Sequence, residues 1–215
     1  VLNVDGYLFT WDTNGDRLFR KNRVPNPGST CVGTDPNRNF KDHWSQEYGG
    51  EADPCTDDYW GSAAFTSAEA LSIAKYVKSL GNVVSYIDFH SYSELFMYPY
   101  GWLSDVTNEV CQGGSPDAST QGPGATDAVN AIQAVNGETF TSGDVCDTIY
   151  PASGNSIDYM YSEAGVTYAY AIELRPNAND ASGNGFLLPA DQILPAAKET
   201  WAGMQALWNY ISPLV

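Results

Sequence analysis

Two residues that could carry out hydrolytic chemistry stand where strands are expected to end. Residues 83–90, VVSYIDFH, are β-branched and aromatic and predict a strand that ends at His90. Residues 167–174, TYAYAIEL, predict another strand that delivers Glu173. A neutral imidazole can bind a metal ion and a carboxylate can move a proton. A histidine at a strand end more often has a structural hydrogen bond, so the residue type alone leaves both readings open.

A serine hydrolase is disfavoured by the residues that such a site needs. The chain has only one other histidine, His43, and it contains no GxSxG segment. That segment forms the strained turn that presents the serine nucleophile in many hydrolases. We therefore look for other chemistry at His90 and Glu173.

Basic residues gather near the start of the chain. Six of the ten Lys and Arg residues lie there: Arg17, Arg20, Lys21, Arg23, Arg38 and Lys41. Such a cluster predicts a site for a small anion, with a solvated basic loop as the alternative. The net charge of −16 and the isoelectric point near 4.1 argue against nucleic acid as a partner.

The segments that must position these residues alternate between strand and helix. Helices are expected at residues 66–80, with Thr66 and Glu69 as a capping box, and at residues 125–135. A last helix is expected at residues 190–211. Its predicted buried stripe is Ile193, Ala197, Trp201, Met204, Leu207 and Trp208. This order predicts an α/β sheet covered by helices on both faces, with ligands beyond the carboxyl ends of its strands.

The remaining sequence is typical of one compact unit with a long ordered loop. Hydrophobic residues make up 43% of the 215 residues and aromatic residues 13%, which excludes a disordered chain. Residues 11–64 are rich in Gly, Pro, Asn and Asp, and loops of that length usually carry function or need a covalent link. No run of 18 apolar residues predicts a membrane span.

The four cysteines favour disulfides. Cys31, Cys55, Cys111 and Cys146 can form two bridges in three ways. Free thiols or a metal site are the alternatives, but no CxxC spacing or nearby pair of histidines supports a metal. Two disulfides predict an extracellular, secreted protein.

Five ordered segments resemble the carboxypeptidase A and B branch of the zinc carboxypeptidases. They are RLFRKNR at residues 17–23, CVGTDPNRNF at 31–40, HSYSELFMYPYG at 90–101, TIYPASGNSIDY at 148–159 and AIELR at 171–175. The resemblance implies a mixed sheet of the eight-stranded type with helices on both faces, of which the N-terminal part is missing. Residues 1–215 would then be the C-terminal two-thirds of a single catalytic domain. It also implies a bridge between Cys31 and Cys55, and Cys111 would pair with Cys146.

The resemblance assigns the reaction chemistry residue by residue. His90 would be a zinc ligand and Glu173 the general base that takes a proton from a metal-activated water. An ion pair of Glu173 with Arg175 is the structural alternative. Arg20 would stabilise the oxyanion, and Asp35 would hold a zinc-binding histidine that lies outside this chain.

The same resemblance assigns contacts with the C-terminal residue of a peptide. Asn37 and Arg38 would bind its carboxylate, Tyr150 would close over it and Tyr92 would also contact substrate. Ile157 would form the base of an apolar specificity pocket that prefers aromatic or large aliphatic residues. The other expected lining residues are Val145, Ile149, Met97 and Ala171, with Asn155 where the family has a small residue. Asp88 also departs from the family and would admit a cationic side chain if it faced the pocket.

The zinc site implied by the resemblance is incomplete in this sequence. The family binds zinc with a further His and Glu separated by two residues, and no HxxE occurs in the chain. His43 precedes Trp44, Ser45 and Gln46 and has no carboxylate at that spacing. We therefore expect the N-terminal segment of the same enzyme to supply the remaining ligands. The alternatives are a module that binds peptide C-termini without zinc, or an inactive fragment.

Overall fold

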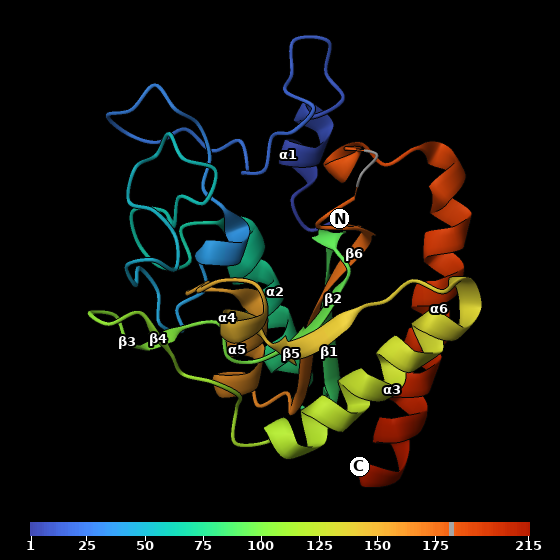
Figure 1. Cartoon of the computed structure of the whole chain (residues 1–215). Helices are drawn as coiled ribbons and strands as arrows, with labels where there is room; N and C mark the ends of the chain where they lie inside the picture. The colour runs from blue at the N-terminus through green and yellow to red at the C-terminus, as the bar shows by residue number, and fades with distance from the viewer. Residues whose placement is uncertain (181–182) are drawn as a thin grey trace.

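The computed structural model describes residues 1–180 and 183–215 and has a mixed β-sheet at its centre (Figure 1). In the described residues this sheet has four strands, in the order β1-β6-β2-β5. Their bounds are Ser85–Ser93 for β1, Tyr168–Asn177 for β6, Leu95–Tyr98 for β2 and Thr141–Asp144 for β5. Strand β6 is parallel to β1 and antiparallel to β2, and β2 is parallel to β5. A separate antiparallel pair is formed by β3 (Leu103–Asp105) and β4 (Val110–Cys111).

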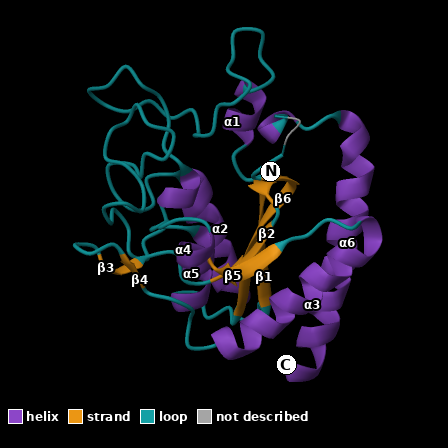
Figure 2. Ribbon diagram, viewed as in Figure 1, coloured by secondary structure: helices purple, strands orange, loops and turns teal. Residues whose placement is uncertain are grey.

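Helices cover both faces of the sheet, as Figure 2 shows. The α-helices are α1 Val4–Phe9, α2 Ala68–Leu80, α3 Ala118–Asn136, α4 Val145–Thr148, α5 Ser156–Ser162 and α6 Ile193–Ile211. Short 3-10 helices occur at η1 Pro36–Arg38, η2 Gly185–Leu187, η3 Ala190–Gln192 and η4 Ser212–Leu214. Helices α2, α4 and α5 lie on one side of the sheet, and α3 and α6 lie on the other (Figure 1). The α/β architecture with helices on both faces is therefore confirmed.

Each face of the sheet has its own apolar core. On the α2 and α5 side, Ala74, Met160 and Ala169 are buried in one cluster. On the α3 and α6 side, Ile132 and Leu207 are fully buried in the other. The two cores use alternate residues of the same strand, because successive side chains of a strand point to opposite faces.

The N-cap of helix α2 lies one residue later than its sequence predicts. Ser67 is its N-cap and accepts a hydrogen bond from the Ala70 backbone N–H at 3.3 Å, so the Thr66 capping box is wrong. Thr66 instead donates its hydroxyl hydrogen to the Ala63 carbonyl at 2.9 Å. The helix ends at Gly81 as predicted, with a positive φ of 68° that glycine adopts without strain.

Helix α3 begins at Ala118, seven residues before its predicted start at residue 125. Gly122, Pro123 and Gly124 obscure the helical pattern in this first part. The close approach of neighbouring side chains explains the glycine at 124, because an added Cβ there would lie 3.0 Å from the Tyr170 hydroxyl. Tertiary packing therefore overrides low helix propensity here.

Helix α6 has a different buried face from the one that its apolar stripe predicts. Met204 and Leu207 are buried, but Ile193, Trp201 and Trp208 are 64%, 54% and 43% exposed, and Ala197 is exposed too. The four exposed residues line an apolar groove of about 620 Å³ beside Phe89 of β1. Within the described residues β1 pairs with a strand on one side only, so the groove lies next to an open edge of the sheet.

The long loop region is held by one disulfide and by buried polar contacts. Cys31 is bonded to Cys55 and Cys111 to Cys146, which confirms both predicted pairings. Within the loop, the buried Asn39 amide donates to the carbonyls of Trp60 and Ala63 at 2.6 and 2.9 Å. These bonds replace the regular hydrogen bonding that the loop lacks. No helix among the described residues is both long and apolar enough to cross a membrane.

Candidate active site

His90 and Glu173 lie opposite each other in the parallel pair β1 and β6. Both line one pocket at the carboxyl ends of these strands. The Oε2 atom of Glu173 is buried and has no hydrogen-bond partner among the residues that the structure describes. Burial raises the pKa of Glu173 to about 6, although the positive charges of His90 and Arg20 act in the opposite direction. Such a carboxyl group can take up and release a proton near neutral pH.

The structure does not support the alternative ion pair between Glu173 and Arg175. Arg175 instead donates from Nε to Glu199 Oε1 at 2.8 Å, and its Nη2 pairs with Glu138 at 3.2 Å. Glu199 is 1% exposed and lies on the buried face of α6. Arg175 therefore joins the sheet to α6 and leaves Glu173 in the pocket.

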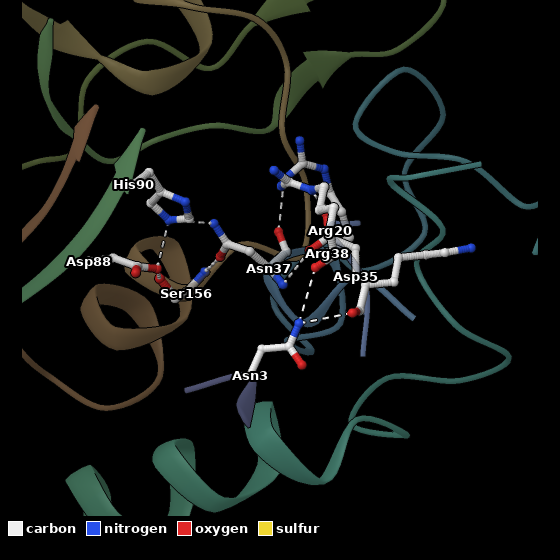
Figure 3. A network of polar contacts seen from close by, with 9 residues as sticks. Asn3, Arg20, Asp35, Asn37, Arg38, Asp88, His90 and Ser156 are labelled. Carbon is white, nitrogen blue, oxygen red and sulfur yellow. Dashed lines mark hydrogen bonds and ion pairs between the residues drawn. The ribbon is translucent and has the colours of Figure 1, made fainter. Parts of the chain in front are cut away.

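The imidazole of His90 has two polar neighbours at the same ring nitrogen (Figure 3). Its Nε2 lies 3.1 Å from Asp88 Oδ2 and 3.1 Å from Asn37 Nδ2. Burial alone would lower the pKa of His90, but the carboxylates of Asp88 and Glu173 act in the opposite direction, and the pKa is raised above its ordinary value. Asp88 Oδ2 also accepts a short hydrogen bond from the Ser156 hydroxyl.

Asp35 positions the basic residues of the pocket. Its Oδ2 accepts from Arg20 Nε at 2.8 Å, and its Oδ1 accepts from the Asn37 backbone N–H at 2.9 Å as the N-cap of η1. Burial would raise the pKa of Asp35, but Arg20 and Arg38 lower it below its ordinary value. The ionised carboxylate thus holds Arg20 and the Asn37 loop in one place.

Asn37 and Arg38 stand side by side at the pocket, where Asn37 also contacts helix α5. The Asn37 Oδ1 atom accepts from the Ser156 backbone N–H at 2.8 Å. Arg38 is 5% exposed, and its Nη1 donates to the Asn37 carbonyl at 2.9 Å. Its Nε is buried and has no partner. A carboxylate is the natural acceptor for such a guanidinium.

One end of the pocket is apolar. Its lining there comes from Met97, Val145, Ile149, Ala152, Ile157 and Ala171. Asn155 also lines it, but its Nδ2 donates to the Ala152 carbonyl at 2.6 Å and to Asp158 at 2.7 Å. Its Oδ1 accepts from the Asp158 backbone N–H at 2.9 Å. The polar groups of Asn155 are therefore satisfied by the protein and are not presented to a ligand.

The two tyrosines of the sequence prediction lie in different places. Tyr150 lines the pocket, is 46% exposed and lies with its ring 5.8 Å from the Arg38 guanidinium. Tyr92 is not among the lining residues of this pocket. Its ring packs edge-on against Phe186 at 4.9 Å. Only Tyr150 is brought beside the other candidate residues.

Comparison with known proteins assigns the chain to a family. The sequence matches the model of Peptidase_M14, zinc carboxypeptidase, over residues 1–203. The chain belongs to the zinc carboxypeptidase family. The chain is 41% identical to mouse carboxypeptidase A4 over 214 residues, which cover 98% of this chain and 46% of that protein. It is 43% identical to a zinc carboxypeptidase of Simulium vittatum over 201 residues, 93% of this chain and 62% of the relative.

Solved structures show the same fold. Bovine thrombin-activatable fibrinolysis inhibitor, solved in complex with tick carboxypeptidase inhibitor, superimposes with a TM-score of 0.89 at 31% identity, over 100% of this chain and 68% of that one. Carboxypeptidase A from Helicoverpa armigera gives 0.86 at 29% identity, over 99% and 50%. The chain spans about half the length of the curated relatives that it matches.

The donor set for zinc in this chain is partial. Among the described residues no three His, Cys, Asp or Glu side chains are grouped so that they could hold a metal ion. His43 stacks on Trp102 at 3.7 Å and pairs with Asp42, away from the pocket. His90, with a carboxylate on one ring nitrogen, and the unpartnered Glu173 carboxylate suit a metal site with further ligands.

Sequence reasoning did not foresee two polar residues that organise the site. Ser156 contacts Asp88 through its hydroxyl and Asn37 through its backbone. Asp158 is fully buried, accepts from the Gly101 N–H at 2.9 Å, and burial raises its pKa to about 8. The Asn155 and Asp158 spacing is that of a helix N-cap with an acidic third residue, which was the available signal.

Proposed function

We propose that this chain is part of a secreted zinc carboxypeptidase that releases aromatic or large aliphatic residues from the C-termini of peptides and proteins. One observation carries the proposal. Glu173, whose buried Oε2 has no hydrogen-bond partner among the described residues, and Arg38, whose buried Nε has none, line the same pocket as the apolar residues around Ile157. A base, an anion site and a side-chain pocket at one place match the needs of an exopeptidase.

Binding begins with the terminal carboxylate of the peptide. Arg38 donates to it from the guanidinium edge that the protein leaves unpaired, and the Asn37 amide adds a donor. An internal peptide segment has no such charge to offer, so this pair selects chain ends. The C-terminal side chain enters the apolar end of the pocket, where a cation would lose its hydration without compensation.

The reaction then needs a base and a donor for the oxyanion. A zinc ion held by His90 and by ligands of a further segment would polarise the scissile carbonyl and lower the pKa of a water molecule to about 7. Glu173 takes the proton of the attacking water and later donates it to the leaving amine. Arg20, whose Nε is used by Asp35, offers its Nη hydrogens to the developing oxyanion. Tyr150 closes over the bound residue, and Tyr92 lies outside the pocket, where it would contact substrate away from the C-terminal residue.

A further segment of the same enzyme completes the zinc site in this proposal. His90 is the ligand that this chain provides, and Asp35 would hold a zinc-binding histidine of that segment. Two features support it: the chain spans about half the length of its relatives, and β1 has an open edge beside an apolar groove. Residues 1–215 alone should therefore bind zinc weakly and lack peptidase activity.

Secretion and protein partners are part of the proposal. Two disulfides suit an oxidising compartment. The solved neighbour in complex with tick carboxypeptidase inhibitor supports a protein as a partner.

The test uses the full chain that the gene encodes, purified with its metal. We expect about one zinc per molecule and release of Phe from a peptide with a free C-terminus. The amidated form of the same peptide should be a poor substrate. Tight peptide binding without zinc or turnover would instead identify a binding module.

A further inference from the structure

We propose that Asn155 is a specificity-determining residue that separates the side-chain pocket from the carboxyl group of Asp158 and so excludes cationic C-terminal residues. The proposal rests on the proposed function and deepens it, because it concerns the class of residue that the pocket accepts. Asn155 lines the pocket, whereas Asp158 is not among the lining residues. Asp158 is 1% exposed and follows three residues after Asn155, the N-cap of α5.

The Asp158 carboxyl group lies behind one wall of the pocket. Its Oδ2 atom accepts from Asn155 Nδ2 at 2.7 Å and from the Gly101 backbone N–H at 2.9 Å. A Cβ added to Gly101 would lie 2.7 Å from Asn155 Nδ2 and 3.1 Å from Cγ1 of Val145, another lining residue. Gly101 thus packs against two residues of the wall while its N–H binds the carboxyl group. The Asn155 amide therefore stands between the pocket and a buried acid.

The Asn155 amide nitrogen occupies the place that the ammonium group of a lysine side chain would take. Its distance of 2.7 Å from Asp158 Oδ2 is also that of a bond between an ammonium group and a carboxylate. The amide is held there, because Nδ2 also donates to the Ala152 carbonyl at 2.6 Å and Oδ1 accepts from the Asp158 backbone N–H at 2.9 Å. Asp158 Oδ1 has no hydrogen-bond partner among the described residues, so the carboxyl group can accept a further donor without losing a bond.

The charge state of Asp158 suits a pocket for uncharged residues while Asn155 covers it. Burial raises the pKa of Asp158 to about 8, and the carboxylates of Asp42 and Asp144 act in the same direction. The hydrogen bonds from Gly101 and Asn155 act in the opposite direction. The carboxyl group is therefore mostly neutral at pH 7 and places no full charge behind an apolar side chain. An ammonium group in contact with it would favour the ionised form.

Asp88, the other acid considered for cationic residues, has different surroundings. It is not among the residues that line the pocket, although its register partner Ala171 is. Its Oδ2 atom accepts from the Ser156 hydroxyl and lies 3.1 Å from His90 Nε2. Asp88 therefore belongs to the contacts around His90, and Asp158 is the acid that lies against the pocket wall.

The experiment uses the full enzyme with its metal and three peptides that differ only in their last residue, which is Phe, Met or Lys. Met resembles Lys in length but carries no charge, so the ratio of kcat/KM for Lys to that for Met isolates the effect of charge. Asn155→Ser shortens the side chain and keeps a good N-cap, and Asn155→Gly is a second variant that costs little as a cap. Both should raise the Lys-to-Met ratio about 10- to 100-fold at pH 7, the value of one hydrogen bond to a charged group.

The double variant Asn155→Ser/Asp158→Asn is the matched control. It keeps an acceptor oxygen for the Gly101 N–H but cannot ionise, so its Lys-to-Met ratio should return to within threefold of wild type. A Lys-to-Met ratio within threefold of wild type in both single variants would overturn the inference. So would a rise that persists in the double variant. If the double variant does not fold, the comparison of Lys with Met in the single variants still separates charge from a wider pocket.

A failure of the proposed function would be recognised separately. If the wild type releases none of the three residues, carboxypeptidase activity is absent and the proposed function fails. Dissociation constants of the same three peptides need no turnover. The Lys-to-Met ratio of the affinities then decides the inference by the same criteria.

Discussion

Glu173 on β6 lies between His90 of the parallel strand β1 and Leu95 of the antiparallel strand β2. This central position explains why the Oε2 atom of Glu173 is buried without a partner among the described residues, although Glu173 lines the pocket. Its position between two paired strands fixes the Glu173 side chain relative to the pocket. A general base needs such a fixed position to reach the proton that it removes.

Replacing Glu173 by Gln should lower kcat by roughly 100- to 10,000-fold, because the base is lost while the shape is kept. The zinc content should not change. Glu163→Gln is the control, since Glu163 forms an ion pair with Lys41 at 2.9 Å near the surface. Steady-state kinetics and metal analysis of both variants check this, and a Glu173 variant with more than a tenth of wild-type kcat would contradict it.

Replacing Arg38 by Ala should lower kcat/KM for peptides with a free carboxylate by roughly 10- to 100-fold, the value of one charged hydrogen bond. Amidated peptides, which are poor substrates already, should lose far less. The comparison uses one peptide in its two forms, with Arg23→Ala as control because Arg23 lies over the ring of Phe9. Equal losses of kcat/KM for both forms would refute the assignment of Arg38 as the residue that binds the terminal carboxylate.

The enzyme should prefer C-terminal Phe, Tyr and Leu to Lys and Arg. Ile157 is 1% exposed in the apolar end of the pocket, and burying an unpaired ammonium against it is costly. Ile157→Asp should move the preference toward Lys. Ratios of kcat/KM for Phe- and Lys-terminated peptides decide it, with the melting temperature as a check on folding. A wild type that prefers Lys refutes the assignment.

Ionisation of Glu94 should destabilise the fold. Glu94 is 4% exposed, and burial together with the nearby Glu138 carboxyl raises its pKa from 4.5 to about 7, although Asn177 and Arg175 act in the opposite direction. Because the folded state holds this proton more tightly, the stabilisation is complete below pH 4.5 and is lost as the pH rises through about 7. Glu94→Gln should therefore raise the melting temperature relative to wild type at pH 8 but not at pH 4. An equal shift at both values would contradict this.

Removing the bridge between Cys31 and Cys55 should lower the free energy of unfolding by about 3 to 4 kcal/mol in the chain-entropy model. The bridge spans 24 positions of a region in which the only regular element is the 3-10 helix η1 among the described residues 11–64. Urea denaturation of the double serine variant measures the loss. A change below 1 kcal/mol would mean that the buried polar contacts hold this loop without the bridge.

The sequence by itself determined the features that depend on neighbouring residues. The strands that carry His90 and Glu173, the end of α2 at Gly81 and the segment around Arg38 follow from local patterns and from the resemblance to a family. Local patterns suffice there because the period of a strand and the conformation of a glycine cap depend on residues close in the chain.

Only the tertiary structure decided which of these residues meet. The contact of Asp88 with His90 and Ser156 joins β1 to α5, across 68 positions of the chain in the case of Ser156. The apolar stripe of α6 could not reveal that Trp201 and Trp208 would stay exposed while Glu199 is buried against Arg175. An apolar side chain is buried only where the fold supplies a surface to cover it, and a charge only where the fold supplies a partner. Both depend on segments that are distant in sequence, which is why periodicity alone did not predict them.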